Sequence, residues 1–468
     1  MAANLYDLVR YPTFPQFQTH PDRLAAVGRL FGMNPAPVEA CRVLEIGCGS
    51  GGNLIPMAYA LPHSRFTGVD LASDPVADGM GMIRDLGLGN IVLESRDLRE
   101  IGPEAGEFDY ILAHGVYSWV PEEVREGLLS ACRACLAPEG IAFISFNSYP
   151  GGHVRQMLRE MMLHHVRETE DPAERIRQAR ELLESLLVTH HWPKAWQEMR
   201  DREVKAMLKW HDGSLYHDEL APFNQRFYLH EFAAAAGRHQ LQYLGEADPH
   251  QMFDPSQGAE GLAGGVLERM QHLDFLKARR FHQALVCRAE RTLNRSITPQ
   301  QMSGFLFSSS GRREDDGQIA GLRGVRISEA DEASCSVALA LGAVYPLPAA
   351  FEELVPYVGN EEVLCEILFA LVITGFADLH VFDFPCEERV TERPRVSRLA
   401  RYQAALSAFV TTARHDTVQL DEVGQRLVQL ADGTRSHAEI ARALGPGIEP
   451  ERVVSGLKWM ASRALLEG

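Results

Sequence analysis

The sequence lacks any apolar run long enough to cross a lipid bilayer. The longest apolar stretch, ILFALVITGFA at residues 367–377, is well short of the roughly 20 residues that a membrane-spanning helix needs. The first residues, MAANLYDLVRYP, also lack the basic start and following apolar stretch that mark a secretory signal peptide. We therefore expect a cytoplasmic protein with no membrane insertion.

Basic residues are scarce. The 468 residues carry a formal net charge of −17, and the first 150 contain ten Arg, no Lys and eighteen Asp or Glu. A protein that binds a phosphate backbone normally presents a basic face, so the composition argues against a nucleic-acid partner. An acidic balance suits a cationic partner, although surface acids often serve solubility alone. The composition leaves the oligomeric state open.

Clusters of metal ligands are missing as well. The eight cysteines are scattered, and the one CxxC, at Cys132 and Cys135, has no second pair at zinc spacing. The histidine pairs in LHHVRE and VTHHWPKAW have no further ligands nearby. We predict no metal site and reduced thiols, which fits a cytosolic protein.

What the sequence does contain is an alternation of short apolar strands and helix-sized gaps after residue 40. This order indicates an α/β fold in which helices cover both faces of a parallel, Rossmann-like sheet. The predicted strands are 42–47, 65–70, 90–95, 108–115 and 141–147.

The sheet is predicted to resume after a long helical insertion. A polar, amphipathic stretch covers about 153–225, and two further apolar runs at 241–247 and 280–289 read as strands. The first domain therefore spans 1–295, with an N-terminal lid over 1–40. Two helical segments with short apolar ends, 296–384 and 404–468, are expected to be α+β winged-helix-like units separated by an Arg-rich linker.

A glycine-rich turn, VLEIGCGSGG at 43–52, follows the first predicted strand. Gly47, Gly49 and Gly52 match GxGxxG, which by itself permits NAD or FAD. Glu45 stands at the carboxyl end of the strand, where its charge would repel a pyrophosphate but attract a sulfonium and an amino group. The spacing ExGxGxG therefore favours S-adenosylmethionine (SAM).

Two more acids fit the same cofactor. Asp70 ends the second strand, where a carboxylate can accept hydrogen bonds from both ribose hydroxyls, and Asp97 follows the third, where it can accept from the adenine amino group. Both could instead be helix N-caps. Leu71 and Leu98, directly after these acids, are also expected in the cofactor site.

The N-terminal segment YDLVRYPTFPQFQTHP is rich in proline and aromatic residues. We interpret it as a lid over the cofactor with Tyr6, Tyr11 and His20 pointing inward, and Tyr6 is predicted to contact the cofactor. The alternative is a strap packed on the first helix.

Several stretches together resemble one family: YDLVRYPTFPQFQTHPDRLAAVGRLFG, GCGSGGNLIPMA, HGVYSWVP, FNSYPGG and DFLKARRFHQALVCR. They are similar to class I SAM-dependent methyltransferases with a methyltransferase regulatory domain, a group similar to the rickettsial protein lysine methyltransferases of outer-membrane protein. The resemblance covers most of 6–290 and continues more weakly toward the C-terminus. It implies SAM as cofactor and a lysine-bearing protein as substrate. A small-molecule N- or O-methyltransferase and a catalytically idle partner-binding protein remain alternatives.

The methyl acceptor is expected at the carboxyl ends of the fourth and fifth strands. His114 could take a proton and also contact the cofactor, and the faces of Tyr117 and Tyr149 could hold an ammonium group. Structural roles for His114 and Tyr117 are equally open, and Trp119 is expected to pack against the next helix.

Overall fold

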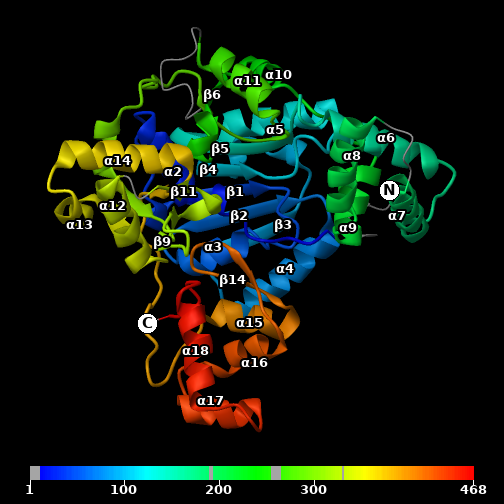
Figure 1. Cartoon of the computed structure of the whole chain (residues 1–468). Helices are drawn as coiled ribbons and strands as arrows, with labels where there is room; N and C mark the ends of the chain where they lie inside the picture. Colours follow the sequence, from blue (N-terminus) through cyan, green and yellow to red (C-terminus); the bar gives the residue numbers. More distant parts are fainter. Residues whose placement is uncertain (1–10, 189–192, 254–264, 329–330, 468) are drawn as a thin grey trace.

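The computed structural model describes residues 11–188, 193–253, 265–328 and 331–467. A seven-stranded sheet lies at its centre (Figure 1). In spatial order the strands are β3 (Ile91–Ser95), β2 (Arg65–Asp70), β1 (Arg42–Ile46), β4 (Phe108–Ala113), β5 (Leu136–Asn147), β7 (Phe281–Arg288) and β6 (Leu241–Glu246).

The first five strands run parallel, and β7 is antiparallel to both β5 and β6. Because β1 is the point where the strand order reverses, the carboxyl ends of β1 and β4 flank the crevice where such sheets bind ligands. The predicted α/β class, the five parallel strands and the two later ones are confirmed.

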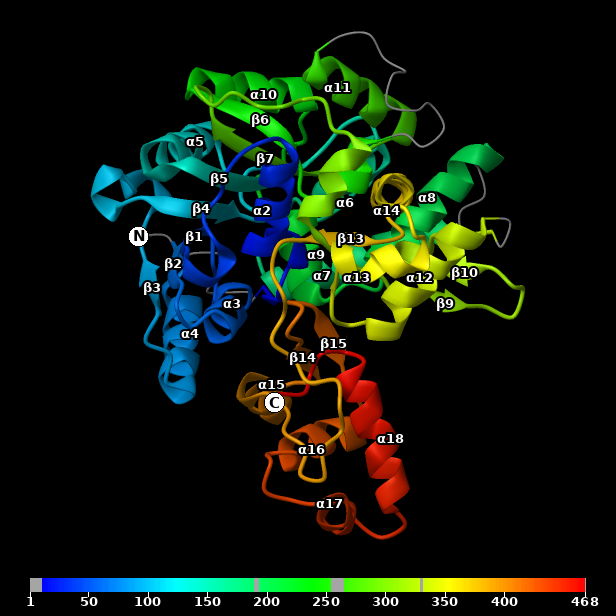
Figure 2. The same cartoon turned by 90° about the vertical axis from the view of Figure 1, so that its left-hand side faces the viewer.

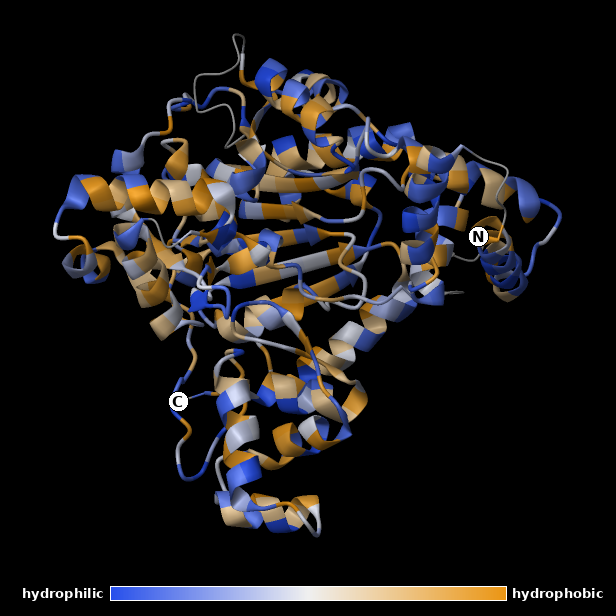
Figure 3. Ribbon diagram, in the orientation of Figure 1, coloured by the Kyte–Doolittle hydropathy of each residue, from blue (hydrophilic) through white to orange (hydrophobic). Residues whose placement is uncertain are grey.

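Helices cover both faces because side chains alternate along each strand. Val43 belongs to the core beneath α2 (Pro21–Leu30), α3 (Leu54–Ala60) and α4 (Ser73–Leu86). Leu44 belongs to the core beneath α5 (Glu122–Cys135), α10 (Leu229–Arg238) and α11 (Val266–Lys277). Figure 3 shows the central strands largely in the colours of apolar residues.

The insertion between β5 and α10 is helical, as expected. It consists of α6 (His153–His165), α7 (Pro172–Leu187), α8 (Lys194–Met207), α9 (Asp212–Leu215) and a π-helical turn, η5 (Tyr216–Leu220). These elements share a small core of their own. A bridge between Ser148 and Phe227 then ties the returning chain to the end of β5.

The middle region packs directly on the N-terminal helix. An antiparallel sheet of β12 (Ala349–Ala350), β8 (Leu306–Ser308) and β13 (Asp378–His380) lies with α12 (Glu332–Val344), α13 (Phe351–Leu354) and α14 (Glu361–Thr374). A second small sheet contains β9 (Arg312–Arg313), β10 (Ile319–Ala320) and β11 (Arg326–Ile327). Ala26 and Leu30 of α2 belong to the core of this region, so its contacts cross the predicted boundary at 295.

The C-terminal unit lies below the sheet in the view of Figure 2. It contains α15 (Arg398–Leu406), the hairpin β14 (Phe409–Thr411) and β15 (Thr417–Gln419), α16 (Glu422–Leu430), α17 (His437–Leu444) and α18 (Pro450–Ala461). The predicted start at 404 falls inside α15. Ser397 caps this helix by accepting from the Ala400 amide.

No helix among the described residues is long and apolar enough to span a bilayer.

Candidate active site

The turn after β1 needs glycine for reasons visible in the backbone. Gly47 and Gly49 have φ of +80° and +53°, values that L side chains rarely adopt. A Cβ on Gly47 would lie 2.6 Å from Val116 Cγ2, and one on Gly52 would lie 2.5 Å from the carbonyl oxygen of Thr13. The turn therefore lets two other segments approach closely and form the walls of a cavity.

That cavity has a volume of ≈ 790 Å³ and lies at the carboxyl ends of the parallel strands. The structure brings together there every described residue that the sequence suggested for the cofactor: Glu45, Gly47, Gly49, Asp70, Leu71, Asp97, Leu98 and His114. Tyr6 lies outside the described residues. We call the part formed by Glu45, Gly47, Gly49, Asp70 and Asp97 the cofactor end.

Glu45 is the buried acid of the cofactor end. Its Oε1 accepts a hydrogen bond of 2.7 Å from Asn53 Nδ2, whereas its buried Oε2 has no hydrogen-bond partner among the described residues. Burial raises the pKa of this carboxyl to about 8, although the Asn53 hydrogen bond opposes the rise. An unsatisfied buried acceptor is costly, so a cationic donor such as the amino group of SAM fits this position.

Asp70 is held by the loop that it supports. Its Oδ2 accepts from the Gly49 amide and its Oδ1 from the Ala72 amide, both at 2.8 Å. These bonds fix the carboxylate at the cavity wall, where its further lone pairs suit ribose hydroxyls.

Asp97 caps a short helix, η3 (Leu98–Glu100), by accepting from the Arg99 amide at 2.9 Å. It also pairs with the Arg99 guanidinium at 2.6 Å. The N-cap interpretation of Asp97 is thus realised, while the carboxylate still lines the cavity.

The N-terminal segment closes one side of the cavity. Thr13 Oγ1 lies 2.7 Å from Ser50 Oγ, and the Gln16 amide donates to Asn53 Oδ1 at 2.8 Å. Tyr11 lines the same cavity. The position of this segment matches the expected lid, although it also packs before α2 as a strap would.

His20 does not point into this cavity, contrary to the expectation. It is the N-cap of α2, where its Nδ1 accepts from the Asp22 amide at 3.2 Å. Its ring lies 5.8 Å from that of Phe384 and 5.5 Å from that of His415. The Pro21 that follows starts the helix and turns His20 away toward the middle and C-terminal regions.

The three acceptor candidates have separate positions. His114 lines the cavity, and burial lowers its pKa to about 4, so the ring is uncharged at neutral pH. Tyr117 is 3% exposed and packs against Phe227 and Phe232, with ring centroids 5.1 and 5.2 Å away. Tyr149 stacks on His153 at 4.3 Å. Neither tyrosine is among the cavity-lining residues.

Sequence reasoning missed the residues that the insertion contributes. Arg155, Trp210, Ser214 and Asp218 line the cavity, and we call them the insertion end. Trp119 also lines it, and its buried Nε1 has no acceptor among the described residues. The same is true of Nη2 of Arg226. Only the folding of the insertion back onto β5 brings Arg155, Trp210, Ser214 and Asp218 to the sheet, so the signal for them in the sequence was weak.

The C-terminal unit also reaches the cofactor end. His415, in the turn between β14 and β15, places Nε2 2.8 Å from Asn53 Oδ1. Burial lowers the pKa of His415 well below its usual value, so the neutral ring can donate this hydrogen bond. Asn53 in turn donates to Glu45. A residue more than 350 positions away thus helps to orient the amide that holds the cofactor-end acid.

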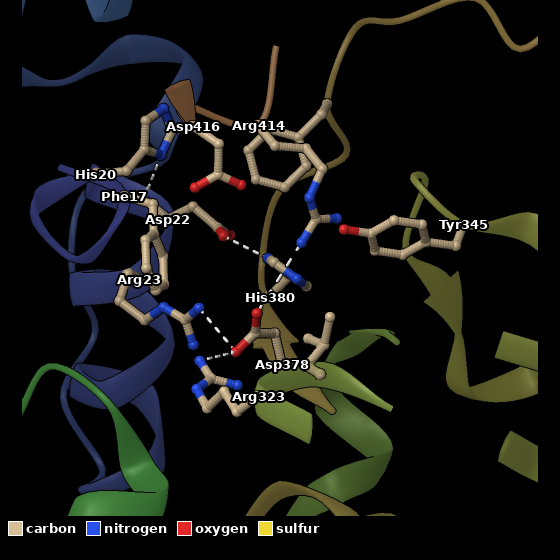
Figure 4. Close-up of a pocket in the computed structure, with 12 residues that line it drawn as sticks. Phe17, His20, Asp22, Arg23, Arg323, Tyr345, Asp378, His380, Arg414 and Asp416 are labelled. Carbon is tan, nitrogen blue, oxygen red and sulfur yellow. Dashed lines mark hydrogen bonds and ion pairs between the residues drawn. The ribbon is translucent and has the colours of Figure 1, made fainter. Parts of the chain in front are cut away.

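A second, smaller cavity of ≈ 170 Å³ lies where the N-terminal helix, the middle region and the C-terminal hairpin meet (Figure 4). Its charged groups largely satisfy one another. Asp22 Oδ2 lies 2.7 Å from His380 Nδ1, Arg23 Nη2 lies 2.9 Å from Asp378 Oδ1, and Arg414 donates to Ser308 Oγ at 3.1 Å. This network joins the three regions. In the part of the chain that the structure describes, no group of three or more His, Cys, Asp or Glu could hold a metal ion.

Three family descriptions match this chain. They are a methyltransferase domain at residues 43–140, a predicted methyltransferase regulatory domain at 211–288 and the PKMT C-terminal winged helix domain at 392–456. The regulatory domain match begins within the insertion and contains Asp218. The winged helix match covers most of the C-terminal unit and confirms the expected winged-helix character there.

Two rickettsial proteins are similar to this chain in sequence. The chain is 36% identical over 308 residues to RP789 of Rickettsia prowazekii, which is 64% of this chain and 56% of that protein, so it spans about half of RP789. It is 35% identical over 242 residues to RP028 of the same organism, covering 51% of this chain and 96% of RP028.

Its fold matches PKMT2 from Rickettsia typhi in complex with AdoHcy, with a TM-score of 0.87, 25% identity and coverage of 98% and 100% of the two chains. The chain therefore belongs to the family of SAM-dependent methyltransferases that carry the predicted methyltransferase regulatory domain and the PKMT winged helix domain.

Proposed function

We propose that this protein is a protein lysine methyltransferase, which transfers a methyl group from SAM to the ε-amine of a lysine in another protein. The observation that carries the proposal is the likeness over 98% of the chain to PKMT2, a name that abbreviates protein lysine methyltransferase. The likeness includes the insertion and both C-terminal regions.

SAM supplies a methyl group on a positively charged sulfur. We infer that Glu45 faces its cationic groups, that Asp70 accepts from its ribose hydroxyls and that Asp97 and Leu98 flank its adenine. The glycine turn lets the backbone approach without Cβ clashes. The protein's task is then to hold the nucleophile in line with the methyl group and to exclude water.

The cavity continues from the cofactor end to the insertion end, which leaves room for an acceptor side chain beside SAM. His114 is uncharged there and would not repel an entering ammonium. We propose that His114 shapes the passage between the two ends. Tyr117 and Tyr149 support the wall from behind and do not touch the acceptor.

The test is incubation of the purified chain with radiolabelled SAM and an unfractionated bacterial lysate, followed by separation of protein from small molecules. We expect label in the protein fraction, recovered as methyl-lysine after acid hydrolysis. Asp70→Ala is the negative control because it removes a cofactor ligand. Label only in small molecules, or only in carboxyl esters of protein, would reject the proposal.

A further inference from the structure

One carboxylate of the insertion end has no role in holding SAM. Asp218 lies on η5, the π-helical turn Tyr216–Leu220, and lines the cavity together with Trp210 and Ser214. Single π-helical turns are frequent at functional sites, because they place a side chain where a regular helix would not. Asp218 also lies within the stretch that matches the regulatory domain.

The turn is fixed to the end of the sheet. Asn224 Nδ2 donates to the carbonyl oxygen of Asp218, and Asn147 Nδ2, at the end of β5, donates to Asn224 Oδ1 at 2.9 Å. The Tyr11 hydroxyl of the N-terminal segment donates to the Asp218 carboxylate. The backbone of Asp218 is thus fixed to the sheet, and its carboxylate is held at the cavity wall by the N-terminal segment.

Arg155, the cation near Asp218, already forms an ion pair with another acid. Arg155 of α6 pairs with Glu219 at 2.5 Å and stacks on the Trp210 ring at 4.2 Å. Arg226 also lines the cavity and donates to Gln156. No ion pair within 4.0 Å involves Asp218 in the described ranges. Apart from the hydrogen bond from Tyr11, the Asp218 carboxylate therefore faces the insertion end without an ion-pair partner among the described residues.

We propose that Asp218 receives the ammonium group of the acceptor lysine and removes one proton from it before methyl transfer. This inference rests on the proposed lysine methyltransferase function. It assigns the insertion a chemical task in addition to shaping the cavity.

The proton and electron balance is simple. The ammonium gives one proton to the Asp218 carboxylate and leaves a neutral amine with a lone pair. This lone pair forms the N–C bond to the methyl group while the C–S bond breaks and its electrons stay on sulfur. The product is a methylammonium and a neutral thioether, and Asp218 returns its proton to solvent.

The charges around Asp218 suit such a base. Burial, with a smaller contribution from Glu219 on the same turn, raises its pKa to about 7, although Arg155 and the Tyr11 hydroxyl oppose the rise. A base acts best when its pKa lies near the working pH. A lysine ammonium has an ordinary pKa of about 10.4, so its burial in the cavity must also favour the proton transfer.

The test measures methyl-lysine formation from labelled SAM and unfractionated bacterial protein between pH 5.5 and 9. For the wild-type chain we expect the rate to rise with pH through about 7. Asp218→Asn should lower the rate about a hundredfold at pH 7.5, the scale of a lost general base, and remove that inflection, while SAM affinity stays unchanged. Tyr11→Phe removes a donor that lowers the pKa of Asp218, so the inflection should move to higher pH.

Asp212→Asn is the matched control. Asp212 is an acid on the same insertion, but it is exposed and pairs with Arg180 at 2.7 Å, so its variant should keep wild-type rates. An unchanged rate and pH profile in Asp218→Asn would overturn the inference and leave the proposed function standing. A wild-type chain that forms no methyl-lysine at any pH would instead reject the proposed function itself.

Discussion

The affinity for SAM should depend on pH through Glu45. This carboxyl is fully buried, and burial raises its pKa to about 8, so it is mostly protonated at neutral pH before the cofactor binds. If SAM binds only the ionised form, its apparent dissociation constant is multiplied by one plus the ratio of protonated to ionised Glu45. Affinity should then fall close to tenfold for each pH unit below about 7, or 1.36 kcal/mol per unit.

The assay is isothermal titration calorimetry with SAM between pH 5.5 and 7.5, with a competing thioether product as a second ligand. His114, which lines the same cavity, has its pKa lowered to about 4 by burial and does not titrate in this range. Burial raises the pKa of Asp218 to about 7, so this group is expected to change charge in the range. Glu45→Gln separates the two, because any slope that remains in this variant belongs to another group.

We expect SAM to bind on the order of a hundredfold more weakly at pH 5.5 than at pH 7.5, because a single carboxyl, Glu45, must lose its proton before SAM binds. The Glu45→Gln variant should bind more weakly at pH 7.5, but with a nearly flat profile. A wild-type dissociation constant that stays constant over this range would refute the assignment of Glu45 to the cationic part of the cofactor. So would a Glu45→Gln profile as steep as the wild-type one.

Three further outcomes follow from single contacts. Asp70→Ala should weaken SAM binding by about a hundredfold in calorimetry, because two charge-assisted hydrogen bonds contribute roughly 3 kcal/mol together; an unchanged affinity would contradict the ribose assignment. His415→Ala should weaken SAM binding about fivefold, since it removes one hydrogen bond from Asn53; no change would mean that Asn53 keeps its orientation alone. Tyr117→Ala should lower the free energy of unfolding by about 3 kcal/mol or more, like other large core truncations, whereas Tyr117→Phe should behave as wild type; a stable Ala variant with lost methyl transfer would restore the acceptor role first expected for it.

The cofactor end could be predicted because its geometry is local. Glu45, Asp70 and Asp97 each stand at or just after the carboxyl end of a parallel strand, so strand order alone places them at one edge of the sheet. The carboxylate of Glu45, two residues before the first glycine, then distinguished SAM from a dinucleotide.

The acceptor side could not be predicted in the same way. Tyr117 follows β4, but the backbone turns at Gly115, with φ of +69°, and sends its ring into the core beside Phe232. Asp218 reaches the cavity only after about 70 residues of insertion fold back onto β5. His415 reaches Asn53 only because the C-terminal unit packs against the cofactor end. Positions that depend on long-range packing leave no periodic signal in the sequence.

The central claim is that a lysine side chain of a protein receives the methyl group. It is tested most directly by tandem mass spectrometry of lysate protein after incubation with the chain and SAM carrying a deuterated methyl group. The account predicts deuterated methyl groups on lysine ε-nitrogens, present with the wild-type chain and absent with Asp70→Ala. Deuterated methyl groups on carboxylates or glutamine amides of protein, or only in the small-molecule fraction, would contradict it.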